Sequence, residues 1–282
     1  MISAAVIEAL KEIVPADKIL LQEPMKLHTT FRIGGPADCL IYLENEEQLS
    51  RIRKYLHLVD VPYTVIGNGS NLLVSDNGYA GIILVIGRYM SKIEVKDCCL
   101  EAEAGALMSQ VAKAAKEHGL TGLEFAAGIP GTIGGGAVMN AGAYGGEMSQ
   151  VVTMVTVVNR SGEIMELDNS TMEYGYRTSV IQNQPFVVTK VTFRLQPGDP
   201  EQIAARMEEL AYLKIPPREQ EENKLLLLRG ERLYEESLGD ERKIIEHALQ
   251  RFEMALNTQD PVKIETGRNE FREFLEEWDQ ES

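Results

Sequence analysis

A glycine-rich stretch from residue 128 to 147, GIPGTIGGGAVMNAGAYGGE, places eight glycines among twenty residues. Glycine lacks a Cβ, adopts positive φ at little steric cost, and exposes consecutive N–H groups that can surround a phosphate oxygen. The stretch has neither the three-residue period of collagen nor the Ser/Gln bias of a disordered linker. It is therefore either a glycine-rich surface loop or a loop whose backbone approaches a pyrophosphate.

A second glycine cluster, GNGSNLLVSD from residue 67 to 76, favours the ligand-binding alternative. It lies between two apolar runs, residues 61–66 and 81–87, that have the composition of strands. Ser70 and Asn71 add side-chain donors beside the Gly-Asn-Gly turn. Neither cluster is followed by the Gly-Lys-Ser/Thr of a Walker loop, and neither fits the Rossmann fingerprint. Together the two loops predict a dinucleotide site of another type.

Two further motifs make the pattern specific: HTTFRIGGPAD at residues 28–38 and YRTS at residues 176–179. In this order and at these separations, the four motifs resemble the UDP-N-acetylenolpyruvoylglucosamine reductase family, flavoenzymes of peptidoglycan precursor synthesis. The resemblance covers residues 1 to about 200. It implies an α+β, two-lobed flavin-binding fold of the MurB/vanillyl-alcohol-oxidase type, with one lobe at residues 1–85 and the second at 86–199, in a cytoplasmic protein.

The same resemblance implies a chemistry. FAD and NADPH would be the cofactors, and a UDP-sugar, UDP-N-acetylglucosamine enolpyruvate, would be reduced to UDP-N-acetylmuramate. Arg177 would be catalytic, because a guanidinium matches the substrate carboxylate and stabilises negative charge on the conjugated alkene; the other interpretation of Arg177 is a surface salt bridge. Tyr176 and Arg177 would contact the substrate. The residues assigned to the cofactor are Gly67, Asn68, Gly69, Ser70, Asn71, Gly128, Ile129, Pro130, Gly131, Thr132, Gly134, Gly135, Asn140, Gly142 and Ala143.

Two aromatic or titratable residues in these motifs keep two interpretations each. His28 is either a contact to a flavin phosphate or a surface residue of a turn. Tyr144 either stacks on a ring of the ligand or fills a gap in the packing.

Residues after 200 have a different composition. They hold only 3 of the 24 glycines, and their 21 acidic and 12 basic residues give a net charge of −9 within a chain of net −15. The apolar positions 245, 248, 249, 252 and 256 form one stripe of a helix that Gly239-Asp240 would precede and cap. Asp260-Pro261 would begin another helix, with Phe271, Phe274, Leu275 and Trp278 on one face.

The tail, residues 200–282, resembles the C-terminal helical segment of a DnaK-type chaperone of the divergent HscC kind. It would replace the reductase family's substrate domain, whose serine protonates the substrate and whose late glutamate completes the active site. After residue 200 the only serines are Ser237 and Ser282, in no such setting. The sequence therefore predicts an impaired reductase. The alternatives are a non-catalytic flavin-binding protein and a helical interaction protein, in either case a chimera of reductase and chaperone fragments.

Composition limits the remaining possibilities. No apolar run of about 18 residues and no basic-then-apolar leader is present, so neither a membrane span nor a signal peptide is expected. Net charge −15 argues against nucleic-acid partners, while a helical partner for the tail stays open. Cys39 and the adjacent Cys98 and Cys99 suggest neither a disulfide framework nor a metal site.

Periodicity and β-propensity predict the elements that must position the loops. Helices are expected at residues 4–13, 45–57 and 107–118, and strands at 39–43, 82–86, 93–95, 151–158 and 187–195.

Overall fold

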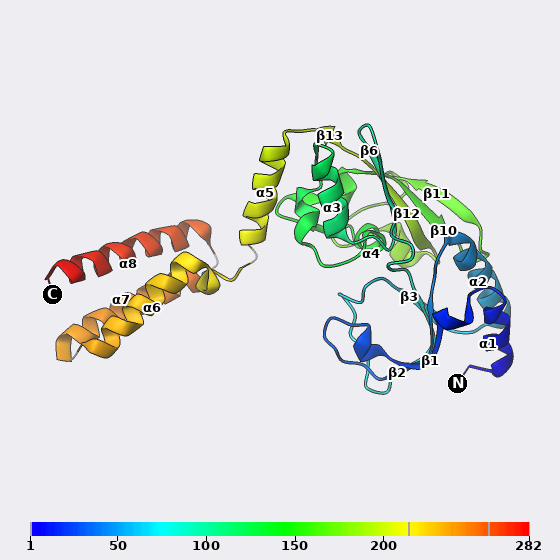
Figure 1. The fold of residues 1–282 in the computed structure, drawn as a ribbon, viewed down its shortest axis with the longest axis horizontal. Coiled ribbons are helices and arrows are strands. Elements are labelled where there is room, and N and C mark those ends of the chain that lie inside the picture. Colours follow the sequence, from blue (N-terminus) through cyan, green and yellow to red (C-terminus); the bar gives the residue numbers. More distant parts are fainter. Residues whose placement is uncertain (1, 214, 238, 259, 282) are drawn as a thin grey trace. The chain divides into compact units, whose positions relative to one another are not determined.

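The computed structural model describes residues 2–213, 215–237, 239–258 and 260–281. The chain divides into two compact units, Met1–Leu210 and Ala211–Ser282 (Figure 1), and each is described by itself. The division falls inside helix α5 (Pro200–Tyr212).

The first sheet of the larger unit has the strand order β1-β2-β4-β3. Strands β2 and β4 and strands β3 and β4 pair in parallel, whereas β1 and β2 are antiparallel. Helices α1 and α2 bury apolar side chains against the same core as this sheet, and Asn45 caps α2 by accepting from the Gln48 N–H at 2.9 Å. The bounds are α1 (Ala4–Lys11), β1 (Ile19–Pro24), β2 (Pro36–Tyr42), α2 (Glu46–Val59), β3 (Tyr63–Ile66) and β4 (Tyr79–Val85).

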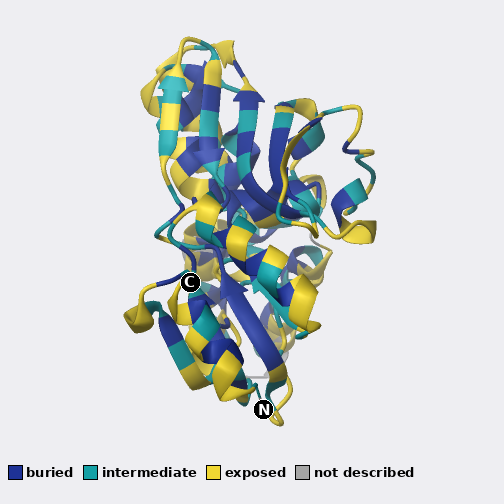
Figure 2. Cartoon of the chain, turned by 90° about the vertical axis from the view of Figure 1, so that its right-hand side faces the viewer, coloured by how far each residue is buried: buried dark blue, intermediate teal, exposed yellow. Residues whose placement is uncertain are grey.

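The second sheet is antiparallel, with the order β11-β10-β12-β6-β5. Helix α3 has a strongly one-sided apolar face that buries Val111, Ala112 and Ala115. Figure 2 shows buried residues concentrated along the strands. The bounds are β5 (Ile93–Lys96), β6 (Cys99–Glu103), α3 (Met108–Glu117), β10 (Val152–Val158), β11 (Ile164–Asp168) and β12 (Val187–Arg194). Two short strand pairs lie outside this sheet: β7 (Leu120–Thr121) pairs with β13 (Gln196–Pro197), and β8 (Gly142–Ala143) pairs with β9 (Gly146–Glu147).

The predicted elements of the first 200 residues are present, with ends shifted by a few residues. The lobe boundary proposed at 85/86 falls between the last strand of the first sheet and the first strand of the second. The lobe assignments themselves stay a prediction.

The smaller unit contains α6 (Glu221–Glu236), α7 (Gly239–Asn257) and α8 (Pro261–Glu281), and every regular element described in it is helical. Its core includes Phe252, Phe271 and Leu275, and Gly230 lets α6 approach, because a Cβ there would lie 2.6 Å from Phe271 Cζ. The predicted cap at Asp260 is confirmed, since its Oδ1 accepts from the Val262 N–H at 3.0 Å. Helix α7 already includes Gly239, so this glycine is not a stop before it; the side chain of Asp240 lies outside the described residues.

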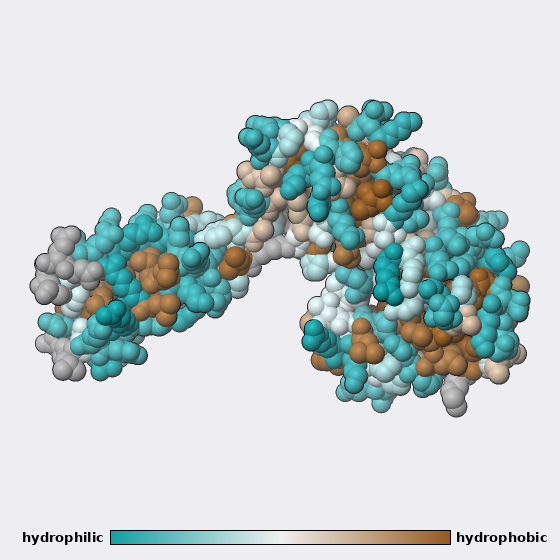
Figure 3. Space-filling model, in the orientation of Figure 1, coloured by the Kyte–Doolittle hydropathy of each residue, from teal (hydrophilic) through white to brown (hydrophobic). Residues whose placement is uncertain are grey.

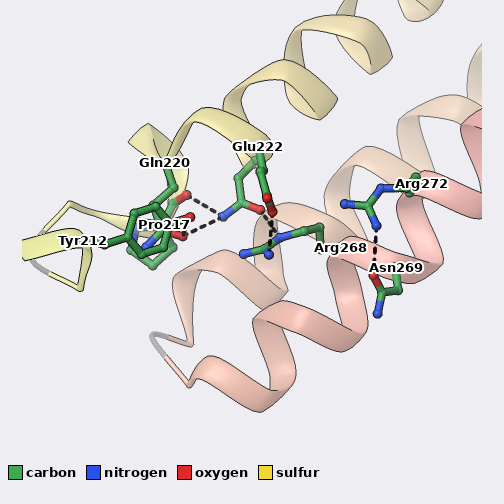
Figure 4. Close-up of polar contacts among 8 residues, drawn as sticks. Tyr212, Pro217, Gln220, Glu222, Arg268, Asn269 and Arg272 are labelled. Carbon is green, nitrogen blue, oxygen red and sulfur yellow. Dashed lines mark hydrogen bonds and ion pairs between the residues drawn. The ribbon is translucent and has the colours of Figure 1, made fainter. Parts of the chain in front are cut away.

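A buried polar cluster joins the start of α6 to α8 (Figure 4). Asn223 is fully buried; it donates to Pro217 O at 2.8 Å and accepts from Arg268 Nε at 2.7 Å. Arg268 also pairs with Glu222 at 2.8 Å. Asn223 Nδ2, Arg268 Nε and Arg268 Nη1 each have an acceptor, so the cluster ties the helices together.

The visible face of the smaller unit is mostly hydrophilic around a smaller apolar patch (Figure 3). Among the residues that the structure describes, no helix combines the length and apolarity that a membrane span requires.

Candidate functional site

The larger unit contains a cavity of about 1210 Å³ lined by both glycine-rich loops. This volume exceeds the roughly 300–1,000 Å³ of ordinary small-molecule pockets. Strand β3 leads into it, residues 67–72, 129–132 and 134–136 form part of its wall, and Arg177 contributes from a third segment. The structure thus brings together three sequence motifs that are far apart in the chain.

The first loop, at residues 67–71, presents a row of unused backbone donors. Among the described residues, the N–H groups of Asn68, Gly69, Ser70 and Asn71 donate to no protein acceptor. Gly69 is buried and has φ +67°, and a Cβ on it would lie 1.8 Å from the carbonyl oxygen of His28. Of these four residues only Gly69 is buried, and a buried backbone N–H is rarely without an acceptor. Four consecutive unused N–H groups, one of them buried, suit an anion-binding nest.

The second loop contacts the first. Ser70 Oγ donates to the Pro130 carbonyl at 3.0 Å. A Cβ on Gly67 would lie 2.4 Å from Thr132 Oγ1, so only glycine allows the two loops to approach this closely. Gly131, with φ +153°, lies beside Ser70 Oγ. The two loops therefore form one continuous wall of the cavity.

Part of the second glycine-rich run is helical, which the sequence did not predict. Thr132 caps the short helix α4 (Ile133–Val138), which lies in the cavity wall. A Cβ on Gly134 would lie 2.8 Å from Ala104 Cβ, and one on Gly136 would lie 2.8 Å from Met108 Sδ. A Cβ on Gly135, in contrast, would lie 3.7 Å from Thr132 Oγ1, an ordinary contact, and Gly135 is exposed. Some of these glycines therefore serve packing, and Gly135 leaves room for a ligand.

Arg177 lies at a two-residue turn held by the bridge between Gly175 and Thr178. Its φ is +56°, and its Nη2 donates to Gly142 O at 3.1 Å. In the described part of the chain the guanidinium forms no ion pair within 4.0 Å, and it lines the cavity. Its remaining donors are thus available to an anionic ligand. Tyr176, beside it, is 92% exposed and does not line the cavity.

Asn140 holds this turn in place. Its Nδ2 donates to Gly175 O at 3.0 Å, and its Oδ1 accepts from the Ser149 N–H at 2.9 Å. Only 3% of the residue is exposed. Like Gly128, Gly142 and Ala143, Asn140 was predicted to bind the cofactor but lies outside the cavity lining; cofactor binding by these four stays a prediction.

The ring of His28 contacts protein groups on both sides. Its Nε2 lies 2.8 Å from Glu23 Oε1, its Nδ1 lies 3.3 Å from Tyr42 Oη, and the side chain is 14% exposed. Burial raises the pKa of the Tyr42 phenol. The backbone carbonyl of His28 is the group that packs on Gly69. Tyr144, the other ambiguous residue, is 42% exposed with φ +55° and lies outside the cavity lining.

Sequence reasoning missed one end of the cavity. Arg53 from α2, Tyr63 from β3, Arg160, Phe186 and Val187 line it. A signal for Arg53 existed, because this charged residue lies on the apolar face that Leu49, Ile52 and Leu56 define. A charged side chain on a buried helix face is uncommon and indicates a special environment.

The site fits an FAD-type dinucleotide. The cavity is large enough, its wall carries free N–H donors, and an exposed glycine leaves the backbone accessible. The residues that would hold the group are the two loops, and the flavin would supply hydride chemistry when bound.

Comparison with known proteins agrees with this fit. Residues 37–168 match the FAD binding domain family. The chain is 42% identical over 206 residues to the UDP-N-acetylenolpyruvoylglucosamine reductase of Clostridioides difficile, covering 73% of this chain and 68% of that protein. It is 44% identical over 204 residues to the protein of the same name from Caldanaerobacter subterraneus, covering 72% of this chain and 67% of that protein.

Solved structures show the same fold. The crystal structure of the reductase MurB from Thermus caldophilus matches with a TM-score of 0.58 and 34% identity, over 68% of this chain and 67% of that one. p-Cresol methylhydroxylase matches with a TM-score of 0.53 over 70% of this chain and 44% of that one, at an identity of 17% that shows the fold alone. The expected two-lobed flavin-binding fold, followed by a helical region, is confirmed. This chain belongs to the UDP-N-acetylenolpyruvoylglucosamine reductase family.

Proposed function

We propose that this chain carries out the FAD-dependent reduction of UDP-N-acetylglucosamine enolpyruvate to UDP-N-acetylmuramate, with NADPH as reductant, in the cytoplasm. The observation that carries the proposal is the position of Arg177. It lies in the wall of the same cavity as the free N–H groups of residues 68–71. An anion nest and a guanidinium with donors left over in one cavity suit a dinucleotide and a carboxylate-bearing substrate.

Each part of the site has a role in this proposal. Residues 67–71 and 128–135 bind the pyrophosphate of FAD through backbone N–H groups. Arg177 binds the enolpyruvyl carboxylate and stabilises negative charge on the alkene, with Tyr176 beside it. Asn140 fixes the turn that carries both residues. A donor stabilises developing charge effectively when its position is fixed before the reaction. The bridge between Gly175 and Thr178 fixes the turn that carries Arg177 in this way.

The proposal includes a slow second half-reaction, the transfer of hydride from the reduced flavin to the enolpyruvyl substrate. The family's proton donor is a serine of a domain that follows the flavin-binding lobes, whereas the elements described after residue 200 are helices. Removing one positioned acid typically lowers the rate by about 10²–10⁴-fold. The flavin is therefore expected to be reduced and then to pass hydride to the substrate slowly.

An anaerobic half-reaction experiment tests the proposal. The flavin is reduced with NADPH, the enolpyruvyl substrate is added, and reoxidation is followed by absorbance. The wild type is expected to reoxidise at a measurable rate below about 1 s⁻¹. Arg177→Ala is expected to remove substrate-dependent reoxidation, whereas Arg194→Ala, an exposed arginine at the end of β12 outside the cavity, leaves the rate unchanged. Equal rates in wild type and Arg177→Ala would contradict the role of Arg177.

A second candidate function rests on the helical unit, which has its own core. In this candidate the chain binds FAD without turnover and acts through a helical partner of residues 200–282. The resemblance of that tail to a DnaK-type chaperone segment, and the chimera it suggests, stay hypotheses; the matched relatives correspond to about 200 residues of this chain. Complete absence of substrate-dependent reoxidation, with FAD bound, would favour this candidate.

A further inference from the structure

Cationic side chains are concentrated in the cavity of an acidic protein. Arg53, Arg160 and Arg177 line it, with Asp60 as the acidic residue in the lining, while the whole chain has a net charge of −15. A hollow lined by one sign of charge concentrates ligands of the opposite sign. Arg177 is accounted for by the proposed function, whereas Arg53 and Arg160 are not.

Arg53 is a buried cation bound only to neutral oxygens. It is 2% exposed. Nε donates to Tyr63 Oη at 3.0 Å, Nη2 donates to Pro185 O at 2.6 Å, and Nη1 donates to Val158 O. A guanidinium has five N–H donors, so these bonds leave two donors over. A buried charge normally has a partner of opposite sign, and none of these acceptors is one.

Arg160 lies two residues beyond Val158, whose carbonyl Arg53 binds, and is exposed. Within the described ranges, neither arginine has a carboxylate within 4.0 Å. Burial lowers the pKa of Arg53, and the nearby charge of Arg160 acts in the same direction. Arg53 is therefore a buried cation that has a second cation nearby and no acidic partner in the described part of the chain, an arrangement that suits an anion supplied by a ligand.

This cationic pair is separate from the anion nest of residues 68–71. Arg53 binds Tyr63 at the start of β3, and the nest follows Ile66 at its end. With a rise of about 3.3 Å per residue, the strand places these two points about 10 Å apart. One phosphate group cannot occupy both.

We propose that Arg53 and Arg160 form a second phosphate-binding point of the cavity, which takes a phosphate group of a bound nucleotide. The proposal rests on the proposed function insofar as the cavity holds nucleotides. The phosphate has two possible sources: the adenosine 2′-phosphate of NADPH and the diphosphate of the UDP-sugar. Arg53 also fixes Val158 and Pro185, so Arg160 is the residue to test.

The test compares ligand pairs that differ in phosphate. NADP⁺ against NAD⁺ and UDP against uridine are titrated calorimetrically into the protein as purified. Arg160→Gln is expected to weaken the phosphate-bearing member of one pair by about tenfold, the scale of a lost charge-assisted contact. Its partner without the phosphate should keep its affinity. Arg160→Lys retains the charge and should recover part of the loss, and Arg194→Gln is the matched control.

Two results would overturn the proposal. One is an unchanged affinity of Arg160→Gln for both NADP⁺ and UDP. The other is an equal loss of affinity for both members of every affected pair, which would indicate a change in the shape of the cavity. The pair that responds identifies the source of the phosphate. Failure of the wild type to bind FAD would refute the proposed function, while the NADP⁺ and UDP comparisons would still decide this proposal.

Discussion

Replacing Gly69 by alanine should disrupt the anion nest directly. Gly69 is buried and has φ +67°, and a Cβ would lie 1.8 Å from the His28 carbonyl oxygen and 3.2 Å from Thr29 Cα. Both obstacles are backbone atoms. The His28 ring is held by Glu23 and Tyr42, and the Thr30 N–H donates to Gly69 O at 3.2 Å, so this segment cannot move aside independently.

The size of the effect follows from two costs. An L-residue in the left-handed region costs about 1–2 kcal/mol. Forcing an added methyl group into a packed site costs about 1–3 kcal/mol more. If the loop must regain its native geometry to bind FAD, the combined cost of about 2–5 kcal/mol lowers the affinity by about thirtyfold to several thousandfold.

The assay is flavin fluorescence quenching on flavin-free protein, which gives the FAD dissociation constant, with thermal unfolding as a parallel measurement. Gly87→Ala is the matched control, because Gly87 lies outside the cavity lining and a Cβ there would lie 3.6 Å from Val85 Cγ1, an ordinary contact. An unchanged FAD dissociation constant in Gly69→Ala would refute the assignment of residues 67–71 to the pyrophosphate.

Four other outcomes follow from the geometry. Gly135→Val should leave the stability of the flavin-free protein nearly unchanged, since the nearest protein atom to a Cβ is 3.7 Å away, but it should lower FAD affinity; equal affinity would place the ligand elsewhere. Asn140→Ala should lower the free energy of unfolding, measured by urea titration, by about 1–3 kcal/mol, because it leaves the partly buried partners of Asn140 without hydrogen bonds. An unchanged free energy of unfolding would contradict the structural role of Asn140. A chain ending at residue 210 should bind FAD with the affinity of the full chain, because the cavity lining lies between residues 53 and 188; a weaker complex would implicate the tail. Burial raises the pKa of the Cys39 thiol to about 11, with Asp38 adding to the effect. At pH 8 iodoacetamide should therefore modify the exposed Cys99 and spare the buried Cys39, as followed by mass spectrometry. Rapid labelling of Cys39 in the native protein would contradict this.

The sequence predicts those elements whose pattern is local. The stripes of α2 and α3 and the β-branched runs of β10 and β12 appear where expected, because one-sided apolar spacing and strand propensity act over a few residues. The cap at Asp260 is equally local.

Features that depend on tertiary contacts could not be predicted. Strand β1 (ILLQEP) has little strand character, includes Gln22 at φ +50°, and exists because it pairs with β2. Helix α4 forms in a glycine-rich run because two of its glycines pack on Ala104 and Met108. Arg53 reaches its acceptors at residues 158 and 185, more than 100 positions away, and no spacing rule indicates such contacts.

The most direct test of the account is the flavin content of the purified chain. We expect a yellow protein with flavin absorbance and about one FAD per chain. Denaturation should release the FAD intact, because no covalent link is proposed. NADPH should bleach the flavin absorbance under anaerobic conditions. A colourless protein that takes up no FAD on reconstitution, while folded by circular dichroism, would contradict the central claim that the two glycine-rich loops form a flavin dinucleotide site.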